Sequence, residues 1–239
     1  MAQSDVSIQD LVDPWWEGTT SKIPEPGMLV WAFVPYVDQV PYTFIPVGRK
    51  DPRKHEEATV RIERLEITKS YACSPPLPVA AMSLDRREVW AAYKAKKRPC
   101  LILSGPSSKE VDGDLTKNLP KKSYAKTVLL APYHGADQEG RAGYPPQLME
   151  RIRHAEYPQF FADSLPIDGK TKESILRLDH LQPFGFNYNS FELSGFKLSN
   201  QAFEVMSDWL HWRLWGGLPA RQDPAEKSIL AIFWDFMNE

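Results

Sequence analysis

Proline is the residue type that most constrains how this chain folds. Of its 239 residues 21 are proline, and nine of those prolines fall between positions 24 and 78. Proline has no backbone N–H to donate to a strand pair, and it breaks the interior of a helix. Long helices and wide, uninterrupted strands are therefore excluded from this part of the chain. We expect short strands joined by fixed turns.

Composition and charge narrow the class of protein. Hydrophobic residues make up 42% of the chain and charged residues 25%, which are the values of an ordinary folded protein and exclude a disordered or collagen-like one. The formal net charge is -2, so no overall positive field attracts nucleic acid. Charge therefore argues against a non-specific nucleic-acid binder and leaves open only a local basic groove.

Cysteine content and the lack of long apolar stretches predict the compartment. Cys73 and Cys100 are the only cysteines, too few for a disulfide framework or a cysteine-based zinc site. No apolar stretch approaches the ~18–20 residues of a membrane span, and the first residues lack the basic and apolar regions of a secretory signal. We expect a cytoplasmic protein with no membrane partner.

Seven segments have the residue types of strands, with Val, Ile, Leu and aromatic residues bounded by turn-forming residues. Residues 58–67 alternate apolar and charged side chains but slip by one position near Arg64, which indicates a bulged, half-exposed strand. The predicted strands span 28–34, 42–47, 58–67, 98–104, 127–132, 157–162 and 173–181.

Capping residues predict where helices begin and end. The predicted helices span 84–96, 145–156, 199–215 and 223–237, and their N-terminal signals are Ser83, Pro145-Pro146, Ser199 and Asp223-Pro224. Tryptophans gather near both ends of the chain, which predicts that the terminal segments dock onto the body of the domain. Many short strands followed by closing helices predict an α+β fold around a small barrel or a strongly bent sheet.

Common catalytic motifs are missing from the sequence. It contains no phosphate-binding glycine loop, no dinucleotide fingerprint, no His-Glu-x-x-His and no nucleophile elbow. We therefore predict neither a cofactor nor a metal, and we look for the site among the predicted strands and their ends.

Four segments resemble strands of one family. Pro26-Gly27-Met28-Leu29-Val30-Trp31, Lys97-Arg98-Pro99-Cys100-Leu101-Ile102-Leu103-Ser104, the strand at 128–132 and the segment at 173–182 are similar to strands of the MazF/PemK (Kid) toxin endoribonucleases. The resemblance implies an SH3-like barrel. One elaborated domain would then span 1–239, with a barrel core at about 26–198, insertions at 49–95 and 105–126, and C-terminal helices at 199–239.

The resemblance also implies a reaction, the metal-independent cleavage of single-stranded RNA by a ribose 2′-hydroxyl. Such a step needs a base, an acid and cations beside the phosphate. Arg177 and Asp179, two apart on a predicted strand, would project from the same face toward one phosphate. Arg98 matches the arginine of the family's Arg-Pro strand and would bind the phosphate through its planar fork.

The sequence departs from the family after the strand at 128–132. Members usually place Thr or Ser near the scissile phosphate, whereas this chain has Tyr133 and His134. His134, with a reference pKa near ~6.5, is a candidate acid or base, and Tyr133 a candidate for stacking on a base. His180 and Gln182 replace the Gln and Arg of the family strand. Lys97 is a candidate contact to RNA at the rim of the site.

Two interpretations remain open. The first is a MazF/PemK-like endoribonuclease that acts on single-stranded RNA, forms a homodimer and is held in check by a small acidic antitoxin protein, as the family implies. The second is an SH3-like barrel that has lost catalysis and binds protein or nucleic acid. Retention of Arg98, Arg177 and Asp179 favours the first, and the missing Thr or Ser favours the second.

Overall fold

The computed structural model describes residues 6–68, 88–105, 113–119, 125–136, 143–167, 172–186, 189–221 and 226–238. Its architecture is mixed α+β, with mostly antiparallel sheets. The chain divides into two compact units, one formed by Met1–Phe33 with Lys97–Glu239 and the other by Val34–Lys96. No helix in the described ranges is long and apolar enough to cross a membrane.

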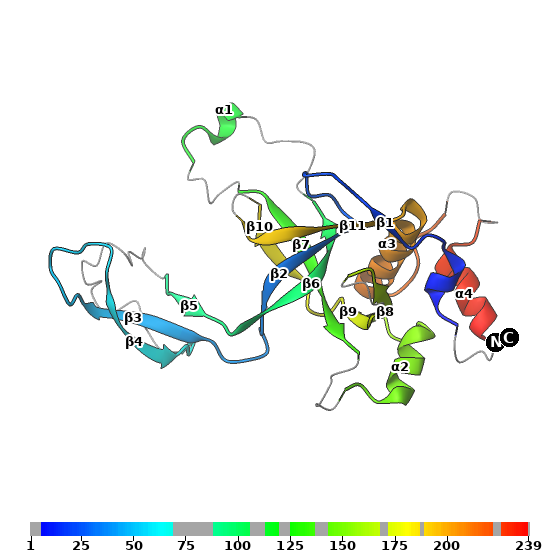
Figure 1. Cartoon of the computed structure of the whole chain (residues 1–239), viewed down its shortest axis with the longest axis horizontal. Coiled ribbons are helices and arrows are strands. Elements are labelled where there is room, and N and C mark those ends of the chain that lie inside the picture. Colours follow the sequence, from blue (N-terminus) through cyan, green and yellow to red (C-terminus); the bar gives the residue numbers. More distant parts are fainter. Residues whose placement is uncertain are drawn as a thin grey trace. The chain divides into compact units, whose positions relative to one another are not determined.

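The larger sheet runs in the order β1-β11-β2-β6-β7-β9-β8, and β10 also pairs with β7 (Figure 1). Its strands are β1 (Trp16–Gly18), β2 (Met28–Pro35), β6 (Ala95–Ser104), β7 (Thr127–Gly135), β8 (Phe160–Leu165), β9 (Lys172–Arg177), β10 (Gln182–Gly185) and β11 (Phe191–Leu198). The fold class α+β is confirmed, but the sheet is not the closed barrel that we expected. The reason lies in β7, whose first half pairs with β10 and whose last residues pair with β9, so the sheet branches within its described strands.

Both faces of the central strands are buried. Leu101, Ala131 and Tyr133 belong to the core shared with the terminal segments, whereas the alternate positions Cys100 and Leu130 are buried on the other face. A smaller apolar cluster on that second face packs around Ile152 of α2 (Pro146–Arg153). Strand alternation thus gives β7 two chemically separate sides.

The C-terminal helices cover the first of these faces, where α3 (Asn200–Trp215) and α4 (Ile229–Asn238) lie beside one another (Figure 1). Ser199 Oγ accepts a hydrogen bond from Ala202 N at 3.3 Å, and Gly216 ends α3 with a φ of 78°, so the predicted cap and stop are confirmed. The terminal tryptophans do dock onto the sheet, in a chain of ring contacts from Trp15 through Phe161, Trp209 and Trp212 to Trp234.

Two predicted helices are corrected. The described part of 84–96 is not helical: Ala91–Ala92 form β5, which pairs with Thr43, and β6 begins at Ala95. The apolar residues of this segment, Val89, Trp90 and Tyr93, are exposed and are good strand formers, so no buried helix face exists there. The last helix begins at Ile229 rather than near Pro224, and Ser228 Oγ accepts from Ala231 N at 3.2 Å; Asp223 and Pro224 lie outside the described residues.

The remaining predicted elements differ mainly at their ends. The strand predicted at 173–181 ends at Arg177 and is followed by a turn, the strand predicted at 157–162 is Phe160–Leu165, and the helix predicted at 145–156 is Pro146–Arg153. β1, β11, the four-residue helix α1 (Gly113–Thr116) and the 3₁₀ helix η2 (Ile8–Leu11) were not predicted, because short or irregular segments carry little periodicity.

The second unit contains a three-stranded sheet in the order β4-β3-β5, with β3 (Tyr42–Gly48) in the centre and β4 (Thr59–Arg64) at one edge. The predicted half-exposed strand is present but shorter than 58–67. The register shifts between Pro46 and Gly48 of β3 rather than near Arg64, where β4 ends. Proline and glycine in β3 account for the shift, because proline cannot donate to the pairing and glycine accepts the φ of 147° found at Gly48.

A buried carboxylate links the N-terminal segment to the larger sheet. Asp163 of β8 is 1% exposed, and it accepts hydrogen bonds from Tyr133 Oη at 2.6 Å, Trp16 Nε1 at 3.1 Å and Gln9 Nε2 at 2.5 Å. Burial raises the pKa of Asp163 to about 6, although the donated hydrogen bonds act in the opposite direction. One side chain therefore holds three separate parts of the chain together.

Replacing Asp163 tests this role. Asp163→Leu leaves the buried Tyr133 hydroxyl and the half-buried Gln9 and Trp16 donors without their acceptor. We expect its free energy of unfolding at pH 7 to fall by about 3 kcal/mol, at the lower end of the ~1–3 kcal/mol cost of each stranded group. Asp163→Asn is the matched control, since its oxygen can accept from Gln9 and Trp16 while its amide donates to the Tyr133 hydroxyl. Urea unfolding measures both; equal stability of the two variants would contradict the account.

The raised pKa of Asp163 gives a pH dependence with a definite sign. Between its ordinary value of 3.8 and about 6 the native state binds more protons than the unfolded state, so this group's contribution to stability is lost as pH rises through that window. Asp163→Asn cannot titrate there. We expect the difference in unfolding free energy between the Asn variant and the wild type to grow in favour of Asn from pH 4 to pH 7, as measured by urea unfolding across that range.

Candidate functional site

Arg177 and Asp179 form a two-point ion pair at the end of β9. Arg177 Nε donates to Asp179 Oδ1 at 2.7 Å and Nη2 donates to Oδ2 at 2.6 Å, with side chains only 17% and 26% exposed. The strand alternation that we expected to align them does not operate, because β9 ends at Arg177. A turn closed by the hydrogen bond from His180 N to Arg177 O brings the two side chains together instead.

Three aromatic neighbours surround the Arg177 guanidinium. Its Cζ lies 5.0 Å from the ring centre of Phe160, its Nη1 lies 3.5 Å from Tyr144 Oη, and its Nη2 lies 2.9 Å from His180 Nε2. Phe160 is set in place by the register of β8 and β9, which pairs it with Arg177. Hydrogen bonding to Asp179 raises the pKa of Arg177, so the guanidinium is a fixed cation held in one orientation.

The carboxylate of this pair is ionised. Burial opposes the charge on Asp179, but the hydrogen bonds from Arg177 outweigh it and hold the pKa of Asp179 below its ordinary value. Asp179 Oδ2 also lies 3.9 Å from His180 Nε2. A cation, a carboxylate and an imidazole are therefore in direct reach of one another.

His134 joins this group from β7. The register of β7 and β9 pairs His134 with Ile175, and its ring lies 5.6 Å from that of His180 at 76°. Burial, followed by the positive charges of Arg98 and Arg177 and by His180, lowers the pKa of His134 to about 3, with Asp179 acting in the opposite direction. His134 Nε2 is buried and has no hydrogen-bond partner among the described residues. The imidazole is thus neutral at pH 7, and its charged form is opposed on several sides.

Arg98 approaches the group from β6. Cys100 of β6 pairs with Pro132 of β7, and Arg98 and His134 each lie two residues beyond that pair on the same end of their strands. The effect of Arg98 on the pKa of His134 agrees with that placement. We name Arg98, His134, Arg177, Asp179 and His180 the arginine–histidine cluster.

The cluster lies on the face of the sheet that the C-terminal helices do not cover. Tyr133 and His134 are consecutive on β7 and point to opposite faces, and Tyr133 belongs to the core that contains the α3 tryptophans. Arg177 likewise alternates with Leu176 of that core. The terminal tryptophans therefore do not seal the cluster.

Two predicted site residues lie outside it. Tyr133 is 1% exposed and its hydroxyl donates to Asp163, so the prediction that it stacks on an RNA base is wrong: alternation places it in the core. Lys97 is exposed, but its ammonium pairs with Glu192 of β11 at 2.8 Å and lies 5.9 Å from the ring centre of Trp31 on β2. It alternates with Arg98 and is directed to the strands on the other side of β6.

Three residues of the site were not predicted: His180, Tyr144 and Phe160. His180 follows Arg177 by three positions, a spacing that reaches back only when the chain turns, and no Gly or Pro marks that turn. Tyr144 and Phe160 come from other segments and meet Arg177 through the pairing of β8 with β9 and through the fold around α2. Only an expected turn after residue 177 could have indicated His180.

Within the described ranges, no group of three or more His, Cys, Asp or Glu side chains is arranged to hold a metal ion. Comparisons of this chain with protein-family models, curated proteins and solved structures found no match. Functional argument therefore depends on the geometry of the cluster itself.

The depressed pKa of His134 can be tested by removing one cation. We expect the Arg98→Met variant to raise the pKa of His134 from about 3 toward 6.5, because one of the charges that oppose the imidazolium is gone. NMR titration of the ring nitrogens measures it. Arg151→Met is the control, since Arg151 is exposed and pairs with Glu156, and it should leave the titration unchanged. An unchanged pKa in Arg98→Met would show that the two side chains are not neighbours.

Proposed function

We propose that this protein cleaves single-stranded RNA in the manner of the MazF/PemK toxins, with the arginine–histidine cluster as its active site. The observation that carries the proposal is the meeting of Arg98 and Arg177 with Asp179 and two imidazoles on one face of the sheet. The same proposal includes a homodimer that acts in the cytoplasm and binds an antitoxin protein.

The cluster's charge suits a phosphodiester. The cluster contains two guanidinium groups, one carboxylate and a neutral His134, and guanidinium groups bind phosphate oxygens through charge-assisted hydrogen bonds. Arg177 Nε and Nη2 donate to Asp179. Arg177 Nη1 lies 3.5 Å from Tyr144 Oη and can also donate to a phosphate oxygen. Fixed donors of this kind stabilise the charge that develops on the phosphorane.

One imidazole can carry the proton from the attacking hydroxyl to the departing oxygen. In the proposed reaction neutral His134 accepts the proton of the 2′-hydroxyl, the 2′-oxygen bonds to phosphorus, and the bond from phosphorus to the 5′-oxygen breaks. His134 then passes the proton that it gained to the departing 5′-oxygen, while His180, whose Nε2 accepts from Arg177 Nη2 at 2.9 Å, holds the guanidinium beside the phosphate. The products are a 2′,3′-cyclic phosphate and a 5′-hydroxyl, and water supplies no atom in this step.

Phosphate binding would make His134 a stronger base. A base with a pKa of about 3 is weak, because efficient proton acceptors have pKa values near the working pH. A phosphate placed between Arg98 and Arg177 adds negative charge that offsets both guanidinium groups, so the pKa of His134 rises when substrate is bound.

Two observations favour a second candidate function, the binding of RNA without cleavage. The same low pKa of His134, together with the engagement of Arg177 by Asp179, suits a site that only holds a phosphate. The alternative shares the ligand and differs in chemistry, so a single set of measurements separates the two.

Cleavage is the decisive measurement. We expect purified protein in EDTA to cut a mixed-sequence single-stranded RNA and to leave 2′,3′-cyclic phosphate ends. Arg177→Met and His134→Asn should each lower the rate by about 10²–10³-fold, the usual effect of losing one group that acts on the transition state. Arg153→Met is the matched control, because Arg153 forms a comparable two-point pair with Glu173 at the start of β9, away from the cluster.

The outcomes separate the candidate functions. Binding of RNA without cleavage by the wild type supports the second candidate, and cleavage that persists unchanged in both cluster variants refutes the assigned site. Circular dichroism and thermal unfolding of each variant exclude loss of folding as the cause.

The effect of phosphate on His134 gives an independent prediction. Adding a 2′-O-methyl RNA, which lacks the attacking hydroxyl and stays intact, should raise the pKa of His134 above about 3 in an NMR titration. The same RNA added to Arg177→Met should produce a smaller rise. No change in the wild type would mean that the phosphate binds elsewhere.

A further inference from the structure

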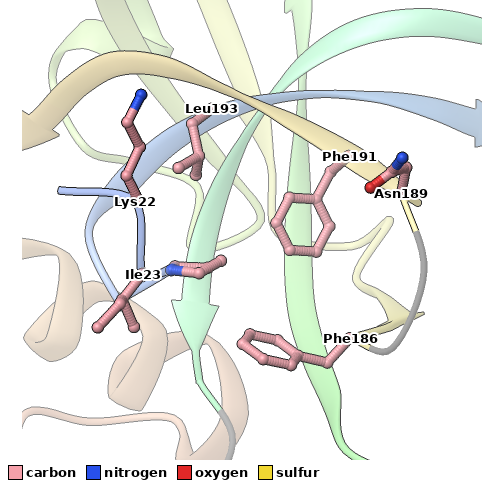
Figure 2. A pocket seen from close by; sticks show the side chains of 7 residues that line it. Lys22, Ile23, Phe186, Asn189, Phe191 and Leu193 are labelled. Atoms are coloured by element: carbon pink, nitrogen blue, oxygen red, sulfur yellow. The ribbon is translucent and has the colours of Figure 1, made fainter. Parts of the chain in front are cut away.

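A pocket of about 430 Å³ opens beside the ends of β10 and β11 (Figure 2). It is lined by an N-terminal stretch at residues 22–24, by Phe186 and Asn189 from the connection between β10 and β11, and by Phe191 and Leu193 of β11. Figure 2 shows the rings of Phe186 and Phe191 on one side of the space and Lys22 with Ile23 on the other.

The pocket and the arginine–histidine cluster share a face of the sheet. Register places Phe191 opposite Ala32 and Leu193 opposite Val30, positions that alternate with Leu29 of the core beneath α3. His134 and Arg177 alternate with residues of that same core. Both features therefore lie on the side away from the C-terminal helices.

β10 connects the two features directly. It begins two residues after His180 and ends one residue before Phe186, whose N–H donates to Lys126 O beside the start of β7. At ~3.3 Å per residue, six residues of strand span at most about 20 Å. A single-stranded nucleic acid needs roughly 4 nucleotides or more to fill a typical binding site, and such a strand can reach from one feature to the other.

We propose that this pocket receives a nucleobase of the RNA strand whose phosphate lies in the arginine–histidine cluster. The identity of the ligand rests on the proposed function. Every base has a π face that stacks on aromatic rings, which Phe186 and Phe191 offer. Asn189 has both a donor and an acceptor for a base edge, Lys22 is a cation for the adjoining phosphate, and no carboxylate is among the described residues that line the pocket.

Loss of the aromatic faces tests the pocket without cleavage. A fluorescent 2′-O-methyl RNA of eight mixed nucleotides gives the dissociation constant by anisotropy. Phe186→Leu and Phe191→Leu keep apolar bulk but remove the ring, and we expect binding about five- to 100-fold weaker for a lost stacked base. Phe33→Leu is the matched control, because Phe33 is an exposed ring of β2 outside the pocket, and it should bind as the wild type does.

Abasic nucleotides locate the base that enters the pocket. Replacing that one nucleotide by an abasic site should weaken binding to the wild type and have a much smaller effect on Phe186→Leu, since the contact is already lost. An abasic site at another position should weaken binding to both proteins equally.

The results distinguish failure of the pocket from failure of the proposed function. Unchanged affinity in both Phe variants overturns the pocket assignment even where the wild type cleaves RNA. Ring-dependent binding with no cleavage supports the pocket and counts against the ribonuclease. A wild type that does not bind the RNA overturns both.

Discussion

Successive side chains of β7 point to opposite faces of the sheet. This constraint places the hydrogen-bond network of Asp163 on one face and the arginine–histidine cluster on the other. Tyr133 is directed into the core, where it donates to Asp163, while His134 is directed to the other face, where it meets His180. A one-residue slip in register would exchange them, placing an imidazole against Asp163 and a phenol beside Arg177. The apolar neighbours on both faces hold the register, because each belongs to a buried cluster.

The buried polar side chains Asp163 and His134 have different surroundings. Asp163 is surrounded by donors from three elements, so its charge or its proton is always within a hydrogen-bond network. His134 has cations for neighbours and a buried nitrogen with no described partner, so its environment favours an arriving anion. The first group contributes to the fold, and the electrostatics of the second underlie the proposed function.

Local signals in the sequence predicted much of the fold, and distant pairings accounted for the errors. Ser199 and Gly216 bound a helix because capping depends on a few adjacent residues. The closed barrel was wrong because closure depends on which strands pair, and β7 changes partner along its length. Arg177 and Asp179 do meet, but through a turn that also brings in His180, and neither Gly nor Pro marks that turn in the sequence. Tyr133 was misjudged because one position decides which face a strand residue occupies.

The contacts of Asp163 also determine whether the residues before Pro26 can be removed from this protein. The family-like strand pattern begins at Pro26, which makes the preceding residues look like a dispensable extension. Yet Gln9 and Trp16 lie in that stretch and supply two of the three donors to the buried carboxylate, and Trp15 stacks on Phe161. A shortened gene product that starts at Pro26 would leave Asp163 with Tyr133 alone as a donor and would uncover Phe161, so the leading residues are an integral part of the fold.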